Sequence, residues 1–533
     1  MFRVLVSDKL SDEGLAVLEA EEGIQVDHKP GIDLAELRKI IPEYDGLIVR
    51  SGTKVTADLL EAAEKLRVVG RAGIGVDNID LGVATARGII VMNSPEGNAI
   101  TTAEHAIALM TSLARRIPQA TASIRSGEWD RAKFSGKELF NQVLGVIGLG
   151  TVGSIVADRA RGLRMRVIAV DPLVTDERAQ RLGVELVSLD ELYRRADIVS
   201  IHVPLTKDNA GMVDAEAFSR MKDGVLLVNA ARGGIVSESA LVEALESGKV
   251  AGAALDVFES EPPHSDNPLL QRDDVVLTPH LGSATTQAQV NVAIDIATQV
   301  RDYFKTGVVR NAVNLPSVSA EELEELGPFI SLGEKLGSFQ GQVCSGGIDE
   351  IEVEYAGQIA ELNVQAVTIA VLKGFLTPWV GDRVNFVNAP HIAQEHGVRV
   401  VESKAAIPED FVSLLTVRVR TKLREHLVSG TIFGRTQPRI VRVDDFRFEA
   451  IPEGPTFLVR NIDRPGVVGR LGTLLGDAGI NIKRMQLGLH LETGQALQLL
   501  SVDPVPPEEV VEAVRGLEGV ESAQLIDLGE PVT

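Results

Sequence analysis

Short apolar runs alternate with amphipathic stretches through the first part of the chain. The apolar runs have the length of strands, and the stretches between them have helical periodicity. The predicted elements are strands at 2–7, 46–49, 68–71 and 89–93, and helices at 10–21, 34–40 and 57–63. Regular alternation of strand and helix favours parallel strands joined by right-handed crossovers, and hence an α/β domain.

A second alternating series follows a long predicted helix at 101–116, which can carry the chain into another domain. Its strand candidates are apolar almost throughout, which is typical of strands buried on both faces. In chain order they are QVLGVIG, RVIAVD, IVSIHVP, GVLLVNAA, AGAALDVF and DVVLTPH. A helix at 286–304 can then return the chain to the first domain, so the pattern predicts two doubly wound α/β domains.

The pattern changes after residue 320. An acidic helical stretch, AEELEELG, is followed by strand-like segments at 351–357 and 413–422, and we find no catalytic motif there. The last stretch, 456–528, reads β-α-β-β-α-β with turns at DRPG, ETG and VPPEE, which is a ferredoxin-like plan. We therefore expect an α+β intervening domain and then a ferredoxin-like domain.

Composition and charge restrict the function classes. The chain of 533 residues is 44% hydrophobic and 24% charged, which is typical of a soluble globular protein with several domains. Its net charge of -22 argues against a nucleic-acid partner, and an anionic substrate would need a local cluster of Arg and Lys. With no signal peptide and no apolar run of membrane-spanning length, we expect no membrane partner and a cytoplasmic location. The one cysteine, Cys344, is interpreted as an inert thiol, and no metal is expected.

The run GLGTVG follows a predicted strand and opens a predicted helix. Gly148 permits the tight turn, Gly150 lets a pyrophosphate approach the backbone, and Gly153 lets the helix pack close to the strand. The amino terminus of the helix offers free N–H groups to phosphates. Asp171 ends the next strand and suits a ribose 2′-hydroxyl, and the three residues after it, PLV, include no Arg or Lys to meet a 2′-phosphate. NAD is therefore favoured over NADP.

Three polar segments follow the later strands of this series. They hold Arg232 in NAARGG, Glu261 in DVFESEPP and His280 in TPHLGS. Ligands of open α/β sheets bind at the carboxyl ends of the strands, so these side chains can converge. Oxidation of a secondary alcohol needs a base such as imidazole, a carboxylate that orients it, and a guanidinium that binds a carboxylate and polarises the developing carbonyl. Each residue alone also fits a loop charge, a solvated acid or a helix cap, but together they predict a dehydrogenase site.

These motifs, in this order and at this spacing, resemble the D-2-hydroxyacid dehydrogenases. The resemblance implies two α/β domains of the flavodoxin or Rossmann type, with the cofactor domain inserted into the substrate domain and the active site in the cleft. It implies that Arg232 binds and polarises the substrate, that Glu261 is the acid partner and that His280 is the general base. The expected contacts of NAD are Gly148, Gly150, Thr151, Val152, Gly153, Asp171, Val203, Pro204, Ala230, Ala231, Arg232, Asp256, His280, Gly282, Ser283 and Ile74.

Two segments of the first domain, RSGT and RAGIGVDN, look like the substrate loops of this family, because each follows a strand. Gly73 and Gly75 let backbone N–H groups face an anionic carboxylate. Arg50, beside Ser51, can supply part of the charge that a phosphate needs. Two ordinary strand-end turns are the alternative.

A further segment, WDRAKFSG, resembles one that lies at the dimer interface of phosphoglycerate dehydrogenases. The resemblance implies that Arg131 and Lys133 approach the active site of the neighbouring subunit and contact the phosphate there. A solvated pair of charges is the alternative interpretation.

The carboxy-terminal stretch VRNIDRPGVV, followed by AGINI, resembles an ACT domain. Such domains bind small amino acids, often across a domain pair, and Asp463 would accept from the α-ammonium group. Asn461 and Asn481 are further candidates for the amino-acid site. A ferredoxin-like module used only for oligomerisation is the alternative.

The whole chain resembles the long phosphoglycerate dehydrogenase type, with an intervening domain before its ACT domain. The resemblance implies oxidation of 3-phospho-D-glycerate to 3-phosphooxypyruvate, the first step of phosphorylated L-serine synthesis, with serine as effector and a homodimer or homotetramer. The expected domains are substrate-binding at 1–97 and 284–316, NAD-binding at 98–283, intervening at 317–453 and ACT at 454–533.

Three alternatives stay open at this point. The enzyme can be another D-2-hydroxyacid dehydrogenase, acting on glyoxylate, glycerate or lactate. It can also be an NAD-sensing scaffold without turnover. In the intervening domain, the basic strand at 418–424 can bind a second anion or form a solvated face, and the solvated face is favoured.

Overall fold

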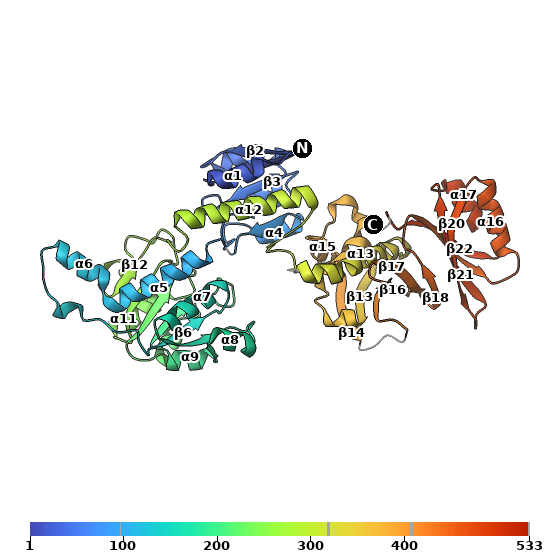
Figure 1. The fold of residues 1–533 in the computed structure, drawn as a ribbon. Coiled ribbons are helices and arrows are strands. Elements are labelled where there is room, and N and C mark those ends of the chain that lie inside the picture. Colours follow the sequence, from blue (N-terminus) through green and yellow to red (C-terminus); the bar gives the residue numbers. More distant parts are fainter. Residues whose placement is uncertain (96, 317–319, 406–409, 531–533) are drawn as a thin grey trace. The chain divides into compact units, whose positions relative to one another are not determined.

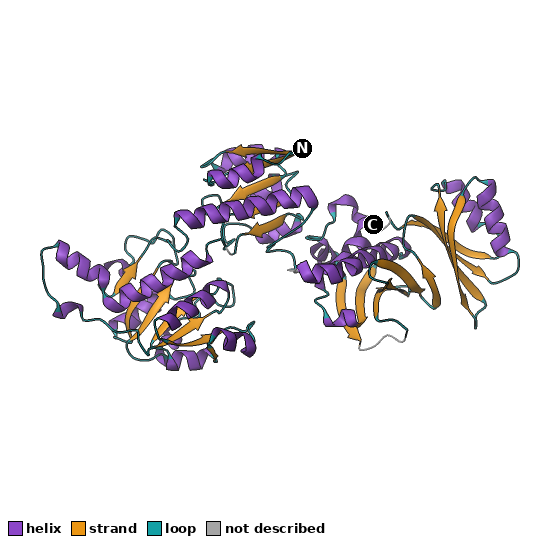
Figure 2. Ribbon diagram, in the orientation of Figure 1, coloured by secondary structure: helices purple, strands orange, loops and turns teal. Residues whose placement is uncertain are grey.

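The computed structural model describes residues 1–95, 97–316, 320–405 and 410–530 (Figure 1). The chain divides into two compact units, Met1–Ile79 with Met92–Asn311, and Asp80–Val91 with Ala312–Thr533. Helices cover the strands of each sheet (Figure 2). The α/β class that the sequence predicts is confirmed. The four domain boundaries stay a prediction, and the one at 317 falls outside the described residues.

The first sheet has the order β2-β1-β3-β4-β5, and strands β1 to β4 pair in parallel. Its elements and the returning helix are β1 (Phe2–Val6), α1 (Asp12–Glu19), β2 (Ile24–His28), α2 (Leu34–Ile40), β3 (Gly46–Val49), α3 (Ala57–Ala62), β4 (Val68–Arg71), α4 (Leu81–Ala86), β5 (Ile90–Asn93) and α12 (Thr286–Thr306). Helix α12 lies where the sequence predicts a helix that returns the chain to the first domain, and it packs on α1. A Cβ at Gly14 would lie 2.7 Å from Ala293 Cβ, so this packing needs glycine.

The second sheet is parallel, with the order β12-β11-β10-β9-β6-β7-β8. Its elements are α5 (Ala99–Arg115), α6 (Ile117–Arg125), β6 (Val143–Ile147), α7 (Thr151–Gly162), β7 (Arg166–Val170), α8 (Asp176–Leu182), β8 (Glu185–Leu186), α9 (Leu189–Arg195), β9 (Ile198–Ile201), α10 (Ala215–Arg220), β10 (Val225–Asn229), α11 (Glu238–Glu246), β11 (Val250–Leu255) and β12 (Val275–Leu277). From β6 the chain first adds β7 and β8 on one side of the sheet and then adds β9 to β12 on the other side, so the strand order reverses at β6. Ligands of such sheets bind at that reversal.

Alternate residues of these strands enter two separate cores. Leu226 and Val228 of β10 pack with α5 and α7, whereas Val225 and Leu227 of the same strand pack with α9, α10 and α11. Both faces of the sheet are therefore covered. This explains why the strand sequences are apolar almost without interruption.

The intervening region forms a sheet of order β14-β13-β15-β16-β17-β18. Its elements are α13 (Ala320–Val343), β13 (Ile348–Gly357), α14 (Gln365–Val380), α15 (Ala389–Glu395), β14 (Arg399–Ala405), β15 (Ser413–Thr421), β16 (Glu425–Phe433), β17 (Gln437–Val443) and β18 (Phe446–Ala450). Arg418 and Arg420 of the basic strand β15 pair with glutamates of β13 and with Glu425. Their charge is therefore matched by carboxylates of the same sheet.

The last region has the predicted β-α-β-β-α-β order. Its elements are β19 (Pro455–Ile462), α16 (Val467–Asp477), β20 (Asn481–His490), β21 (Gln495–Asp503), α17 (Glu508–Arg515) and β22 (Val520–Asp527). The strands pair antiparallel in the order β20-β21-β19-β22. Apolar side chains of both helices and of the central strands, among them Phe457, Leu471 and Val514, form its core.

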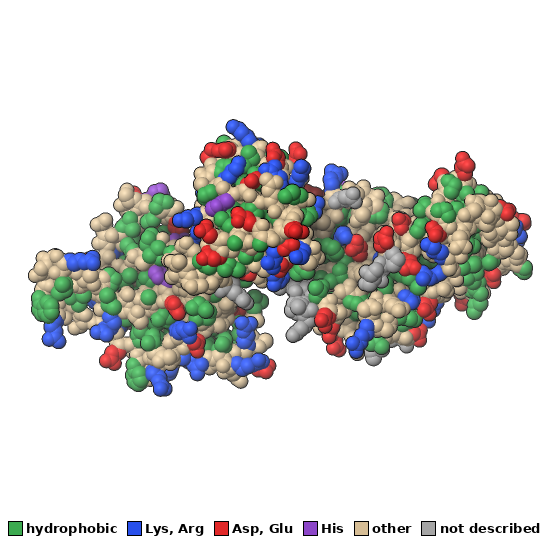
Figure 3. All heavy atoms as spheres, turned by 45° about the horizontal axis from the view of Figure 1, so that its top comes forward, with side chains coloured by type: hydrophobic (Ala, Val, Ile, Leu, Met, Phe, Trp, Pro, Cys, Tyr) green, Lys and Arg blue, Asp and Glu red, His purple; other side chains and the backbone are tan. Residues whose placement is uncertain are grey.

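The charged side chains are spread over the surface. On the face drawn in Figure 3, acidic and basic side chains are interspersed. Among the described residues, no helix combines the length and the apolar character that are needed to cross a membrane.

Candidate active site

The glycine-rich turn lies between β6 and α7, at the reversal of the strand order. Gly148 has a φ of 92°, which favours glycine, and a Cβ at Gly153 would lie only 1.9 Å from the Gly148 carbonyl oxygen. At Gly150, by contrast, no described atom lies within 4 Å of the place a Cβ would take. Helix α7 starts there without a side-chain cap. The turn thus has free backbone N–H groups and open space for a phosphate.

Asp171 lies directly after β7 and beside this turn. Its carboxylate accepts hydrogen bonds from the Leu149 and Leu173 N–H groups, both at 2.8 Å. The structure thus brings Asp171 to the turn that the sequence predicts to bind a dinucleotide.

His280 and Glu261 form a close pair, although they follow different strands. The His280 Nδ1 atom lies 2.7 Å from Glu261 Oε2, and Glu261 Oε1 accepts from the Phe258 N–H. The hydrogen bond to Glu261 raises the pKa of His280 against the effect of burial. Burial, the largest single influence, favours the neutral acid at Glu261, but the bond and charge of His280, the Phe258 N–H and the charge of Arg232 together lower the pKa of that carboxyl. With Nδ1 held by a carboxylate, the imidazole is oriented to exchange a proton at Nε2.

Arg232 lies three residues beyond the end of β10 and reaches the loop after β4. Its Nε donates to Asp77 Oδ2 at 2.8 Å, and its Nη1 donates to the Ala231 carbonyl oxygen at 2.7 Å. A Cβ at Gly75 would lie 1.7 Å from Arg232 Nη2, so a larger residue there would displace the guanidinium from its present position. The charge of Arg232 also lowers the pKa of both Glu261 and His280. The three predicted catalytic side chains therefore share one site.

The structure adds Arg71, which the sequence analysis did not single out, to this site. Arg71 ends β4 and is largely buried, and burial lowers its pKa to about 10. The neighbouring guanidiniums of Arg232 and Arg50 contribute to this lowering of the pKa, and Asp77 and Asp8 oppose it. Its Nε has no hydrogen-bond partner among the described residues. A buried guanidinium with an unused donor, beside two others, is suited to an anionic ligand.

The loop that carries Arg50 is held from two sides. Asp8 accepts from the Arg50 N–H at 2.5 Å and from the Thr53 N–H at 3.1 Å, while the Asn78 amide donates to the Arg50 and Thr53 carbonyl oxygens, each at 2.7 Å. The two predicted substrate loops are thereby tied together next to Arg232.

Asp256 lies directly after β11 and is fully buried. Its carboxylate accepts from the Leu281 N–H at 2.7 Å and the Gly282 N–H at 2.8 Å, and its carbonyl oxygen accepts from the His280 N–H. His280 has a left-handed φ of 53°, a conformation that costs a residue other than glycine of order 1 kcal/mol or more. These bonds hold His280 in that conformation.

A cavity of about 420 Å³ lies beside His280 and Glu261. Its other lining residues include Phe258, Leu270 and Leu277, so its wall is mainly apolar. An apolar wall limits the access of water to the imidazole from that side.

Other predicted site residues lie elsewhere. Arg131 and Lys133 are exposed, and within the described residues neither is joined by a hydrogen bond or ion pair to the arginine cluster. In the ACT region Asn461 is buried and its Oδ1 accepts from Gln498, whereas Asp463 and Asn481 are exposed.

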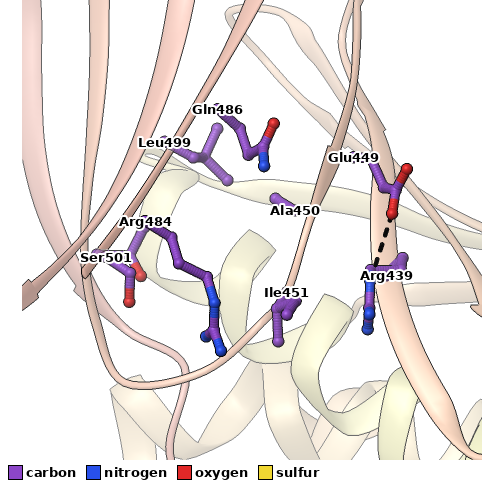
Figure 4. Close-up of a pocket in the computed structure, with 9 residues that line it drawn as sticks. Arg439, Glu449, Ala450, Ile451, Arg484, Gln486, Leu499 and Ser501 are labelled. Carbon is purple, nitrogen blue, oxygen red and sulfur yellow. Dashed lines mark ion pairs between the residues drawn. The ribbon is translucent and has the colours of Figure 1, made fainter. Parts of the chain in front are cut away.

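A separate cavity of about 220 Å³ lies between the intervening sheet and the ACT sheet. Arg439 pairs with Glu449 at 3.6 Å on one wall, and Arg484 and Ser501 lie on the opposite wall (Figure 4). Arg484 pairs with Glu453. Each arginine is matched by a carboxylate, so the charge of the cavity does not assign a ligand.

Three family models match the chain. The NAD binding domain of the D-isomer specific 2-hydroxyacid dehydrogenases matches residues 107–282, the D-3-phosphoglycerate dehydrogenase intervening domain matches 325–444, and the ACT domain matches 456–519. The fold and the site thus define a D-2-hydroxyacid dehydrogenase with an ACT domain towards its carboxy-terminal end.

Full-length relatives narrow the class. D-3-phosphoglycerate dehydrogenase of Archaeoglobus fulgidus is 45% identical over 528 residues, which are 99% of this chain and 100% of the relative. The enzyme of that name from Bacillus subtilis is 41% identical, with the same coverage of both chains. The chain therefore belongs to the D-3-phosphoglycerate dehydrogenase family and is an NAD-dependent oxidoreductase.

A solved structure agrees with this assignment. D-lactate dehydrogenase of Aquifex aeolicus, complexed with NAD and lactic acid, is 28% identical with a TM-score of 0.52, and the match covers 59% of this chain and all of that one. The shared part is the pair of α/β domains, so the dehydrogenase fold is common to enzymes with different substrates.

Proposed function

We propose that this protein oxidises 3-phospho-D-glycerate to 3-phosphooxypyruvate, the first step of phosphorylated L-serine synthesis. NAD, when bound, accepts the hydrogen of the substrate C2 as hydride. The observation that carries the proposal is the convergence of Arg232, Glu261 and His280 beside a cluster of arginines and a dinucleotide turn.

Each of these side chains has a distinct task in the proposed reaction. His280 takes the proton of the C2 hydroxyl at Nε2, and Glu261 stabilises the imidazolium that forms. Arg232 binds the α-carboxylate and polarises the C2 oxygen as it becomes a carbonyl. The proton on His280 leaves to solvent before the next turnover.

The arginine cluster supports a phosphorylated substrate. Arg50, Arg71 and Arg232 bring three positive charges together in a chain whose net charge is -22, with Asp8 and Asp77 as partial compensation. Such a cluster offsets the repulsion between the acidic protein and an anion with a carboxylate and a phosphate. We propose that Arg50 and Arg71 contact the phosphate, and that Gly73 and Gly75 face the carboxylate.

The substrate assignment is tested by following NADH formation with 3-phospho-D-glycerate and with D-glycerate. We expect kcat/KM to be higher for the phosphorylated acid by roughly 10²-fold, the equivalent of about 3 kcal/mol from two charge-assisted contacts. A preference for D-glycerate, glyoxylate or lactate would replace the proposal with another member of the class. A protein that binds NAD without turnover would favour the sensing scaffold.

We expect Gly153→Ala to weaken NAD binding and to lower the free energy of unfolding by about 1–3 kcal/mol, because the new Cβ would overlap the Gly148 carbonyl oxygen, 1.9 Å away. Gly162→Ala is the matched control, since nothing lies within 4 Å of a Cβ at that end of the same helix. Calorimetric titration with NAD and thermal unfolding measure both effects. Equal NAD affinity in the two variants would contradict the role of the turn.

We also propose a homodimer or homotetramer in which Arg131 and Lys133 serve the neighbouring active site. The indole of Trp129, two residues away, is 82% exposed, and Ile124 and Phe140 are also exposed. Large apolar side chains gathered on one surface segment support an interface between subunits.

Serine is the proposed effector, bound where β19 meets α16 of the ACT region. Asp463 is exposed in that loop, and α16 begins after Gly466 without a side-chain cap. A carboxylate for an ammonium group and free N–H groups for a carboxylate suit an α-amino acid. The intervening and ACT boundaries proposed above are supported by the matched ranges 325–444 and 456–519.

Asp463→Ala is expected to abolish serine binding and serine inhibition in the full-length protein, because the ammonium group loses its charged acceptor. Calorimetry and inhibition assays measure the two effects. Asp477→Ala, at an exposed position of the same domain, is the control and should keep both. Inhibition that survives Asp463→Ala unchanged would place the effector site elsewhere.

A further inference from the structure

His105 of helix α5 reaches the end of strand β11 and contacts a buried carboxylate. Its Nε2 lies 3.1 Å from Asp256 Oδ1 and 3.2 Å from Thr278 Oγ1. The side chain of His105 is only 18% exposed, and that of Asp256 is 1% exposed. This contact lies outside the pair of His280 and Glu261, and it joins a helix to the loop that follows β12.

The chemistry of Asp256 fixes the direction of this hydrogen bond. An ionised carboxylate only accepts, so the Nε2 atom of His105 must carry a proton and donate. The other donors to the same carboxylate are the Thr278 hydroxyl at 2.5 Å and the Leu281 and Gly282 N–H groups. Burial favours the neutral acid, but these bonds outweigh it and hold the pKa of Asp256 below its ordinary value.

Asp256 in turn holds the loop that carries His280. The Asp256 carboxylate accepts hydrogen bonds from the N–H groups of the two residues after His280 and from the hydroxyl of Thr278, two residues before His280. The Asp256 carbonyl oxygen accepts from the His280 N–H. The left-handed conformation of His280 depends on this set of bonds. A rotation of the Asp256 carboxylate would therefore move the imidazole.

We infer that His105 is a positioning residue of the active site, and that its Nε2–H keeps Asp256 in the orientation that places the His280 imidazole against Glu261. The inference rests on the proposed function in one respect, since it takes His280 as the base. His105 itself lies behind Asp256 and is not assigned a contact with substrate.

The inference predicts a change in the titration of His280. The charged groups that face His280 are Glu261 and Asp256, which raise its pKa, and Arg232, which lowers it, and His105 faces Asp256 from α5. The hydrogen bond to Glu261 is the largest influence. If the loop loses its anchor, that bond loosens, and the pKa of His280 falls toward its ordinary value.

The test compares His105→Gln with His105→Asn in the full-length protein. The amide nitrogen of Gln can take the place of Nε2 and donate to Asp256. The side chain of Asn is too short to bring its amide nitrogen within reach of Asp256. For the Asn variant we expect kcat to fall roughly 10- to 100-fold, the size of effect that a small misplacement of a reacting group produces. Its KM for 3-phosphoglycerate should change little, and the acid limb of its pH profile should move to lower pH. The Gln variant should have a kcat and an acid limb of the pH profile close to those of the wild type.

The pKa of His280 is also measured directly, by NMR titration of isotope-labelled histidines with His280→Ala to assign the signal. This readout needs no turnover, so failure of the proposed activity and failure of this inference are distinguishable. A wild-type pKa and kcat in the Asn variant, or equal losses in the Gln and Asn variants, would overturn the inference. Should the Asn variant not fold, Thr278→Val removes another donor to the same carboxylate, and an unshifted pKa of His280 in that variant would overturn it as well.

Discussion

Replacement of His280 by alanine is expected to lower kcat for phosphoglycerate oxidation by roughly 10²- to 10⁴-fold, the usual contribution of a general base. The imidazole pairs with Glu261 at 2.7 Å through Nδ1. The variant lacks this imidazole, which we propose takes the hydroxyl proton. NAD binding should survive, because the glycine turn and Asp171 are unchanged. Steady-state kinetics and calorimetry with NAD measure the two effects.

His264→Ala is the matched control for this prediction. His264 is exposed and lies in the segment between Glu261 and His280. Its replacement should leave kcat within about a factor of two, in line with the small effects of most surface substitutions. A kcat for His280→Ala close to that of the wild type would mean that another group acts as the base.

The pH dependence follows from the same pair. Only the neutral imidazole accepts a proton, so kcat/KM for oxidation should rise as pH passes upward through the raised pKa of His280. Glu261→Gln removes the charge that stabilises the imidazolium, so the acid limb should move to lower pH. An unmoved limb in that variant would show that the carboxylate does not govern the titration.

Arg232→Lys should lower kcat/KM by roughly 10²-fold, the equivalent of about 3 kcal/mol, although the charge is kept. A guanidinium can donate to a carboxylate and to a developing carbonyl oxygen in a fixed plane, whereas an ammonium is a point charge. The loss of the Nε bond to Asp77 also removes the contact that orients the side chain. The measurement is kcat/KM for 3-phosphoglycerate with NAD saturating.

Arg220→Lys serves as the control for Arg232→Lys. Arg220 is exposed on α10 and pairs with Glu216 of the same helix. Its replacement should not change kcat/KM. If Arg232→Lys behaved like this control, the guanidinium would have no part in substrate binding.

Much of the α/β architecture could be predicted from the sequence because strands buried on both faces have an unmistakable composition. Strands β6, β9 and β10 lie within predicted apolar runs, and β11 begins one residue before its predicted run. Strand β2 was missed because it lies at the edge of its sheet and buries fully only Ile24, so its sequence, IQVDH, shows no apolar run. The short helix α4 lacks a long amphipathic pattern, and only two strands of the intervening sheet have a composition clear enough to predict.

The site residues that follow the ends of predicted strands could be predicted from the sequence. Arg232, Glu261 and His280 follow β10, β11 and β12, so the rule for parallel sheets was enough to bring them together. Arg71 and His105 could not be found in this way. Arg71 resembles the last residue of an ordinary strand, and His105 lies within the amphipathic pattern of α5. The positions of these two side chains in the site depend on which strands and helices become neighbours. A single sequence does not specify these neighbours.

The central claim is that Arg232, Glu261 and His280 promote the transfer of hydrogen from C2 of 3-phosphoglycerate to NAD. The most direct test uses substrate deuterated at C2 and examines the NADH product by NMR or mass spectrometry. We predict that each NADH carries the deuterium of one substrate molecule, and that its formation is lost in His280→Ala. NADH free of deuterium, or no NADH from this substrate with the wild-type protein, would contradict the claim.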